Sequence, residues 1–307
     1  MKELWTEKYR PSTIDGYVFT DNIQKQSVEH WIQERSIPHL LLSGPAGTGK
    51  TTLAKLLVNA LEIQSFDFLQ VNASRDNGVD FLKNRIENFV STMPFGHLKI
   101  VLLDEADYLS HNAQGILRGL METYQEQARF ILTCNMPHKI IAPLKSRCQH
   151  FIIDKTDITE FTARAATVLV AEGVEFELDT LDSYVRATYP DLRSCLKLLQ
   201  GNSITGHLTL ENKNSVDSAL DHRVEVIRLF KQGRIREART LLCKNTTQDE
   251  MESVFRWMYD NLDLWGSTPE VQDQAITIIR QGLINHAVIA DPEINLSATM
   301  VELAKLQ

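Results

Sequence analysis

Residues 43–52 read SGPAGTGKTT and lie between an apolar stretch, residues 39–42, and a stretch with helical apolar spacing, residues 53–57. The eight residues 44–51 fit the P-loop pattern G-x-x-x-x-G-K-[ST]. A glycine-rich turn between a strand and a helix lets backbone N–H groups converge on phosphate at the helix N-terminus. This segment therefore predicts a nucleotide site.

The side chains of the P-loop indicate which groups meet the nucleotide. Lys50 supplies a positive charge to the β- and γ-phosphates, and the Thr51 hydroxyl is a Mg²⁺ ligand. A nucleotide and Mg²⁺ are therefore the expected cofactors. The residues expected at the phosphates are Gly44, Pro45, Ala46, Gly47, Thr48, Gly49, Lys50, Thr51 and Thr52.

Two later apolar runs, residues 99–103 and 130–134, end in polar side chains. Asp104 at the first tip can hold Mg²⁺ through water, and Glu105 beside it can polarise the attacking water. Adjacent acids favour hydrolysis over binding alone; the alternative is a solvated acidic turn. Asn135 at the second tip is placed to orient the water or contact the γ-phosphate, although asparagine at a strand end is also common turn chemistry.

Length and composition describe an ordinary soluble globular protein. The chain has 307 residues, enough for two or three domains, with 43% apolar and 23% charged residues. No run approaches the roughly 18 apolar residues of a membrane span, and the start MKELWTEKYRP is no signal peptide, so we expect no membrane partner. The four cysteines are far apart, which argues against a zinc module or disulfides and favours the cytoplasm.

Net charge limits how the protein can bind nucleic acid. Lys and Arg number 32 against 40 Asp and Glu, so the formal charge is −8. An acidic total does not exclude a DNA partner, but any contact with DNA must then be local.

The order of apolar runs predicts an α/β domain followed by helices. Five short runs separated by helical patterns predict a parallel sheet covered on both faces. They are residues 39–43, 67–71, 99–104, 130–133 and 150–153. After residue 153 the strand signals stop, and we expect an α/β domain over 1–153 and helical domains over 154–221 and 222–307, with looser chain at 202–214.

Four motifs together resemble the AAA+ ATPases, and more narrowly the clamp-loader subunits of the replication factor C type. They are Trp5-Thr6-Glu7-Lys8-Tyr9-Arg10-Pro11, Asp104-Glu105-Ala106-Asp107 with Ala113-Gln114 and Leu117-Arg118, Ser146-Arg147-Cys148, and Pro190-Asp191-Leu192-Arg193. The resemblance covers nearly the whole chain. It implies a P-loop AAA+ domain with a five-stranded parallel sheet, an α-helical lid domain and an α-helical collar domain, with ATP as the nucleotide.

The function that the resemblance implies is that of an ATPase motor subunit. ATP bound between subunits would open a sliding clamp and grip primer–template DNA, and hydrolysis would release the loader. The implied partners are copies of this chain in a ring or spiral, a dissimilar loader subunit, the clamp, and DNA without sequence preference. Two alternatives stay open: a nucleotide-binding scaffold subunit that does not hydrolyse, and another AAA+ task on DNA, such as a helicase loader or initiator.

The resemblance also implies roles for residues outside the P-loop. Arg147 would reach the γ-phosphate of a neighbouring subunit as an arginine finger, a task that suits an always-charged, bidentate guanidinium. Arg193 would reach the phosphates from the lid of its own subunit. The residues that would border the adenine are Tyr9, Arg10, Pro11 and Val18.

The DNA contacts implied by the resemblance lie at the starts of two helices, residues 79–90 and 113–124. Helix N-termini attract phosphate without a large positive total, which reconciles DNA binding with the net charge. The candidates are Arg75, Asn77, Gly78 and Lys83 at the first helix and Ser110, His111, Asn112 and Arg118 at the second. Clamp contact is expected at residues 84–95, with Met93 and Phe95 as apolar anchors or as inward-packed loop residues.

The C-terminal block carries Trp257, Tyr259 and Trp265, which we interpret as core or interface residues in preference to a base-stacking platform. Residues 289–296 look most similar to the large subunit of T-even-type phage clamp loaders. Cellular clamp loaders usually have Val-Gly where this chain has Val18-Phe19. We therefore expect a bacteriophage protein, acting in the host cytoplasm.

Overall fold

The computed structural model describes residues 3–19, 21–75, 78–209, 218–247, 250–286, 288 and 291–306. The chain divides into two compact units. One unit is Arg10–Thr156, and the other combines the residues before Arg10 with those after Thr156. Among the described residues, every helix is too short or too polar to cross a membrane.

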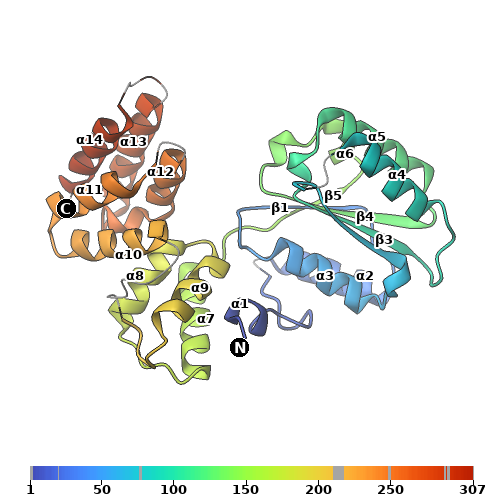
Figure 1. Ribbon diagram of the computed structural model, residues 1–307, viewed down its shortest axis with the longest axis horizontal. Helices are drawn as coiled ribbons and strands as arrows, with labels where there is room; N and C mark the ends of the chain where they lie inside the picture. Colours follow the sequence, from blue (N-terminus) through green and yellow to red (C-terminus); the bar gives the residue numbers. More distant parts are fainter. Residues whose placement is uncertain are drawn as a thin grey trace. The chain divides into compact units, whose positions relative to one another are not determined.

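The unit Arg10–Thr156 is built on a sheet of five strands (Figure 1). All strand pairs are parallel, and the spatial order is β2-β3-β4-β1-β5. The strands are β1 (Leu40–Ser43), β2 (Phe68–Asn72), β3 (Lys99–Asp104), β4 (Ala128–Cys134) and β5 (Gln149–Ile152). The predicted five-stranded parallel sheet is thus confirmed, with strand ends that differ from the prediction by at most two residues.

Helices cover both faces of this sheet, which explains why its strands are apolar throughout (Figure 1). Successive side chains of a strand point to opposite faces. Leu40 and Leu42 of β1 pack with α2 (Asn22–Gln33) and α3 (Lys50–Ala60). Leu41 belongs to the opposite face, whose covering helices are α4 (Val79–Val90), α5 (His111–Thr123) and α6 (Ala142–Lys145).

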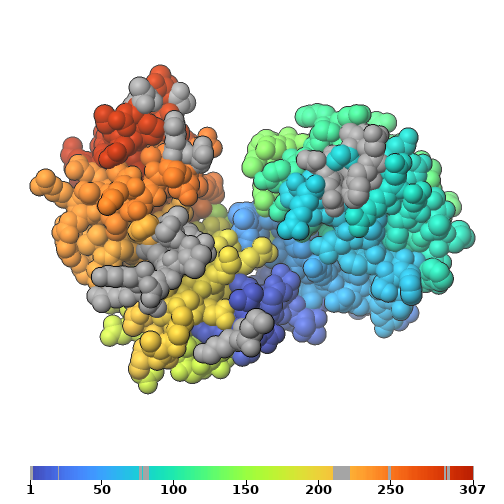
Figure 2. Space-filling model, viewed as in Figure 1, coloured from blue at the N-terminus to red at the C-terminus, as the bar shows by residue number. Residues whose placement is uncertain are grey.

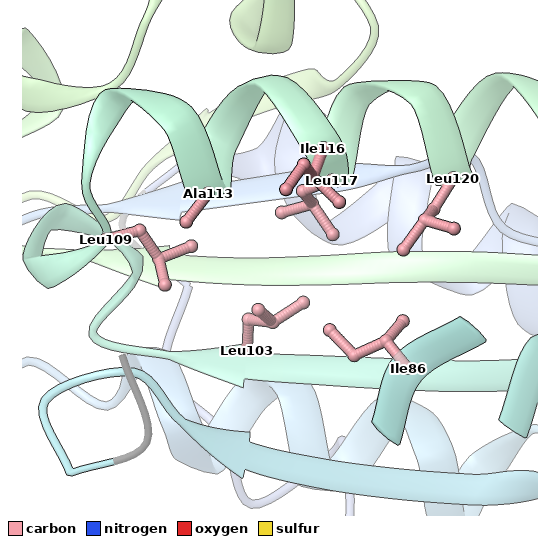
Figure 3. Close-up of a pocket in the computed structure, with 7 residues that line it drawn as sticks. All are labelled: Ile86, Leu103, Leu109, Ala113, Ile116, Leu117 and Leu120. Atoms are coloured by element: carbon pink, nitrogen blue, oxygen red, sulfur yellow. The ribbon is translucent and has the colours of Figure 1, made fainter. Parts of the chain in front are cut away.

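Helix α5 lies over the sheet on an apolar face (Figure 3). Leu109, Ala113, Leu117 and Leu120 turn toward Leu103 of β3 and Ile86 of α4 around a cavity of about 10 Å³. The gap is at the lower limit for one water and is lined only by apolar side chains, so it is a packing defect of the core.

The start of α5 differs from the prediction. The Ser110 hydroxyl accepts a hydrogen bond from the backbone N–H of Ala113 at 3.2 Å, so Ser110 is the N-cap. His111 and Asn112 therefore form the first turn of the helix, where the sequence had suggested that they precede it. The N-cap of α4 is Gly78, without a side-chain cap.

The second unit is helical. Its helices after Thr156 are α7 (Ile158–Ala171), α8 (Leu178–Thr188), α9 (Leu192–Asn202), α10 (Ser218–Lys231), α11 (Ile235–Asn245), α12 (Met251–Asp260), α13 (Pro269–His286) and α14 (Pro292–Ala304). Short 3-10 turns complete the chain at η1 (Ser65–Asp67), η2 (Ala106–Tyr108), η3 (Pro137–Lys139) and η5 (Leu262–Leu264). Helix α10 runs across the expected boundary between residues 221 and 222, and the division into lid and collar stays a prediction.

The N-terminal helix α1 (Trp5–Lys8) packs within this helical unit, where Figure 2 shows it in blue beside the yellow helices. Trp5 is buried in the core, and its backbone N–H donates to Oε1 of Gln200 at 3.0 Å. Tyr9 donates its hydroxyl to Oε1 of Glu172 at 2.7 Å. The opening motif therefore serves as a packing element of the helical unit before the chain enters the sheet.

The C-terminal tryptophans are core residues, as predicted. Trp257 and Trp265 are buried and their rings meet edge to face, with centroids 5.9 Å apart. Their indole N–H groups donate to the carbonyls of Arg186 and Met258. Tyr259 is 42% exposed and belongs to the surface.

His39, which directly precedes β1, gives the fold a pH dependence. Burial, followed by the positive charge of Arg129, lowers the pKa of His39 to about 4. Its Nδ1 accepts the backbone N–H of Phe130 at 3.1 Å, so the neutral ring is the form that fits.

We predict that the free energy of unfolding falls as the pH drops from about 6.5 toward 4. In this range His39 is protonated in the unfolded chain but stays neutral in the folded chain. His39→Asn keeps an acceptor but does not titrate there. Urea unfolding at several pH values should show a smaller loss of stability for the variant than for the wild type. Equal losses would contradict the prediction.

Candidate nucleotide site

The P-loop connects β1 to α3 in a conformation that requires glycine. Gly44, Gly47 and Gly49 have φ angles of 154°, 73° and 93°. A Cβ on Gly44 would lie 2.1 Å from the carbonyl oxygen of Ile153. Gly49 is the N-cap of α3, and no side chain caps this helix. The first N–H groups of α3 are thus left for an anion, which fits a phosphate.

Lys50 is buried at the base of this loop. Its ammonium donates to the carbonyl oxygens of Gly44 at 2.9 Å and Pro45 at 2.6 Å. The Thr48 hydroxyl donates to the same Pro45 carbonyl at 2.9 Å. These bonds hold the loop in shape and place the Lys50 ammonium beside the phosphate cradle, where a P-loop lysine meets the phosphates.

One carboxylate oxygen joins the P-loop helix to two strands. Oδ1 of Asp104, at the end of β3, accepts the hydroxyls of Thr51 at 2.8 Å and Thr133 at 2.5 Å. The backbone N–H of Glu105 donates to the Thr133 hydroxyl at 3.0 Å. The two predicted metal ligands, Thr51 and Asp104, are therefore in direct contact. A hydroxyl and a carboxylate beside a phosphate cradle fit Mg²⁺, which keeps several waters and phosphate oxygens as ligands.

Thr133 was missed by the sequence reasoning. It lies two residues before Asn135 on β4 and is only 1% exposed. A hydroxyl inside an otherwise apolar buried strand was the available signal, because buried polar groups need partners.

The chain turns sharply after Asp104. Glu105 adopts the left-handed conformation with φ 60° and ψ 44°, unusual for a residue with a side chain. The turn brings Asp107 back to the end of β4, where its Oδ2 accepts the backbone N–H groups of Asn135 at 3.1 Å and Met136 at 3.0 Å. The tips that carry Glu105 and Asn135 are thus tied together, and the Asn135 side chain is exposed.

The candidates for the adenine are divided between the two units. Tyr9 belongs to the helical unit and Arg10, Pro11 and Val18 belong to the sheet unit, so their contact with the adenine stays a prediction. Tyr17, which the sequence reasoning also missed, lies against the P-loop, with its ring 3.1 Å from where a Cβ on Gly49 would be.

Arg193 is exposed near the start of α9 in the helical unit, so its contact with phosphate stays a prediction.

Arg147 lies at the opposite edge of the sheet from the P-loop. It precedes β5, whose first residue Gln149 pairs with Leu40, the first residue of β1. The P-loop follows the last residue of β1, so at about 3.3 Å per residue the length of the strand, roughly 13 Å, separates the two edges. Arg147 donates to the carbonyl of Pro143 at 2.6 Å and forms an ion pair with Glu122 of α5.

The cysteines near the site are not nucleophiles at neutral pH. Burial, followed by the charge of Asp107, raises the pKa of Cys134 to about 12, and burial raises the pKa of Cys148 to about 12. Both thiols stay protonated. His150, hydrogen-bonded to the Ser43 hydroxyl at 2.6 Å, has a pKa lowered mainly by burial.

The predicted DNA contacts follow the carboxyl ends of β2 and β3. Arg75 and Lys83 are exposed near the start of α4, and Asn77 is outside the described residues. His111, Asn112 and Arg118 are exposed on α5, where Ser110 is the N-cap. Helices α4 and α5 follow β2 and β3 as the P-loop follows β1, and these strands are parallel, so both N-termini lie at the edge of the sheet that carries the P-loop (Figure 1).

Comparisons with known proteins agree with this geometry. Residues 40–156 match the family model described as "ATPase family associated with various cellular activities (AAA)". The replication factor C small subunit of Sulfurisphaera tokodaii is 33% identical over 98% of this chain and 95% of its own length. The corresponding subunit of Archaeoglobus fulgidus is 35% identical over 78% of this chain and 77% of its own length.

A solved structure, the Thermotoga maritima RuvB Holliday junction branch migration motor, shares the fold. It covers 72% of this chain and 79% of its own chain with a TM-score of 0.55. At 15% sequence identity this likeness concerns the fold alone.

We predict that Thr133→Val raises the Mg²⁺ concentration needed for half-maximal ATP turnover and lowers turnover about 10-fold, whereas Thr133→Ser stays near wild type. Valine has the shape of threonine without the hydroxyl that holds Asp104 and the N–H of Glu105. Losing a group that orients a metal ligand typically costs 10- to 100-fold. Steady-state ATPase assays across a Mg²⁺ titration, with melting temperatures as the folding control, test it. An unchanged Mg²⁺ titration for Thr133→Val would contradict this role.

Proposed function

Since this chain belongs to the family of replication factor C small subunits and carries an AAA ATPase domain, we propose that it is the ATP-hydrolysing motor subunit of a sliding-clamp loader. It would act as several copies in a ring or spiral with a dissimilar subunit, and it would open the clamp and load it onto primer–template DNA.

The observation that carries the proposal is the separation of the catalytic residues between two edges. Lys50, Glu105 and Asn135 gather at the carboxyl edge of the sheet, while Arg147 is at the amino edge. A finger arginine at that edge cannot serve its own P-loop, so a complete site requires the neighbouring subunit. This arrangement fits a motor that works only when assembled.

Each residue of the site has a task in hydrolysis. When bound, Mg²⁺-ATP supplies the phosphoanhydride bond that is broken. Lys50 neutralises phosphate charge, Glu105 accepts a proton from the attacking water, and Asn135 orients that water. Arg147 of the neighbouring subunit stabilises the charge that develops on the transferred phosphoryl group, an effect worth about 10³–10⁵ in turnover in other NTPases.

The N-termini of α4 and α5 supply a DNA grip suited to an acidic chain. Gly78 leaves the first N–H groups of α4 without a side-chain cap, and three exposed cations are available: Arg75 in the turn before α4, Lys83 on α4 and Arg118 on α5. Phosphate contacts of this kind carry no base information. We therefore expect binding without sequence preference and with a log–log salt slope of about −0.9 per phosphate contact.

An apolar patch at the amino edge of the sheet fits a contact with the clamp. Phe66, Met93 and Phe95 are 73%, 79% and 83% exposed, and the two phenylalanine rings lie 5.6 Å apart. The buried carboxylate of Asp67 fixes this loop by accepting the N–H groups of Phe95 at 3.0 Å and Gly96 at 2.7 Å. Large apolar side chains held outward by a rigid loop are typical anchors of a protein interface.

The helical unit offers a second interface. A groove of about 800 Å³ runs between α12 and α13, with Ile276, Ile279 and Leu283 among its lining residues. Of its lining residues, Tyr259 is 42% and Leu283 46% exposed, and the neighbouring Ile284 on α13 is 53% exposed. Apolar side chains from two helices, together with the charged Glu252, Arg256 and Arg280 in the same lining, support the proposed collar, in which copies of the chain pack side by side.

The finer proposals concern origin and composition. Phage origin with action in the host cytoplasm rests on the C-terminal motif and on Val18-Phe19, and the named relatives are archaeal. The dissimilar subunit rests on the family resemblance. Both stay predictions.

We predict that turnover rises when primer–template DNA and the clamp are added to the loader complex, and that Lys50→Ala and Arg147→Ala each abolish most of it, by about 10³-fold for the finger. A mixture of the two variants should regain partial turnover, because an intact P-loop then meets an intact finger at some interfaces. The measurement is steady-state ATPase with each variant alone and mixed. Turnover that ignores DNA and clamp would favour a scaffold or a helicase-loader role, and absence of rescue would contradict a shared site.

We predict that Met93→Ala combined with Phe95→Ala raises the clamp concentration for half-maximal stimulation at least about 10-fold, since interface anchors commonly cost 2 kcal/mol or more when truncated. DNA-stimulated turnover without clamp should not change. Leu178→Ala, which truncates a similarly exposed apolar residue of the helical unit, is the matched control. Equal effects of the two changes would argue against the patch.

A further inference from the structure

We propose that Asp107 is a positioning residue for ATP hydrolysis. Its buried carboxylate holds the backbone of Asn135 in place next to the turn that carries Glu105. The inference deepens the proposed function and rests on the role given there to Asn135. Asp107 itself does not contact the nucleotide, because it is only 6% exposed and lies beneath the strand tips.

The peptide group between Cys134 and Asn135 is held from two sides. Its N–H donates to Oδ2 of Asp107 at 3.1 Å, and its carbonyl oxygen accepts the N–H of Gly44 at 3.2 Å. One partner belongs to the segment that follows β3 and the other is the first glycine of the P-loop. Fixing both atoms of this peptide sets its plane, and the next N–H, that of Met136, is held by the same carboxylate oxygen. With the peptide groups on both sides of Asn135 held, rotation about its φ and ψ is restricted, and so is the direction in which its side chain leaves the backbone.

The same short segment provides the acids and the holder. Asp104 lies at the metal position and Glu105 at the position of the base, and the left-handed turn at Glu105 returns Asp107 to β4. Residues 104–107 and the peptide group between Cys134 and Asn135 therefore fix the distance between the Glu105 carboxylate and the Asn135 amide. Hydrolysis depends on this distance, since a misplacement of about 1 Å can lower the rate 10²-fold.

The buried carboxylate of Asp107 has a desolvation cost that a purely structural support would avoid. Oδ1 of Asp107 is buried and accepts no hydrogen bond among the described residues. Buried carboxylate oxygens normally find partners. Locally unfavourable choices of this kind are expected at functional sites.

The fold contains a matched structural counterpart. Asp67 is also buried and also accepts two successive backbone N–H groups, those of Phe95 and Gly96, but it does so at the amino edge, away from the nucleotide. Removing either carboxylate takes away the same kind of support from a loop. Of the two changes, only the removal of the Asp107 carboxylate should lower the rate of ATP hydrolysis.

The experiment measures kcat and KM for ATP in the assembled loader with DNA and without clamp, together with melting temperatures. We expect Asp107→Ala to lower kcat about 10- to 100-fold while KM changes less than about twofold, because positioning is lost and ground-state binding is kept. Asp107→Asn, whose amide oxygen can accept both N–H groups, should recover most of kcat. Asp67→Ala should lower the melting temperature and leave kcat unchanged in this assay, which omits the clamp that the Asp67-held loop is proposed to contact.

The double variant Asp107→Ala/Asn135→Ala separates this role from others. If Asp107 acts through Asn135, the double variant has the kcat of Asn135→Ala alone. A multiplicative loss, or a loss of kcat in Asp67→Ala equal to that in Asp107→Ala, overturns the inference. If Asp107→Ala does not fold, Asp107→Ser replaces it, since its side chain is one atom too short to accept both N–H groups.

The failure of this inference and the failure of the proposed function give different results. If Asn135→Ala lowers kcat and Asp107→Ala does not, only the positioning role is overturned. If Asn135→Ala leaves kcat unchanged, the result contradicts the role of Asn135 in the proposed mechanism. It then also contradicts the positioning role of Asp107.

Discussion

The oxygen Oδ1 of Asp104 is the point on which the nucleotide site depends. It accepts hydroxyls from Thr51 on α3 and Thr133 on β4, so one atom joins the P-loop helix to the tips of two strands. Hydrogen bonds to a charged acceptor are stronger than those between neutral groups. The protein's own hydrogen bonds therefore set the relative positions of the phosphate cradle, the proposed metal position and the proposed base, as electrostatic stabilisation of a transition state requires.

The same sheet that assembles most of the site also divides it. Parallel strands place all turns that follow them at one edge, and Lys50, Glu105 and Asn135 each lie in such a turn or at its end. Arg147 precedes a strand and so lies at the other edge. No rearrangement within a rigid parallel sheet brings the two edges together. In the proposed mechanism, dependence on a neighbouring subunit is thus a consequence of strand direction.

The sequence predicted what depends on local pattern. The P-loop, the five strands and the acids at the end of β3 were predicted because each is determined by one continuous segment. Its apolar spacing or the placement of its glycines is compatible with a single local structure. Thr133 was not recognised, and Asp107 was named only within a motif and given no role, because their partners come from segments about 28 residues away and depend on β3 lying beside β4. The helix start at His111 was misjudged because a serine can cap a helix or belong to the preceding loop.

Two aspartates show how this fold makes its edges rigid. Asp67 and Asp107 each accept two successive backbone N–H groups, one at the amino edge under exposed aromatic rings and the other at the carboxyl edge under Asn135. A loop whose backbone is anchored in this way presents its side chains in one orientation and loses less conformational entropy when a partner binds. The sheet and its edge loops therefore act as one body, which the chain leaves only between Tyr9 and Arg10 and between Thr156 and Asp157.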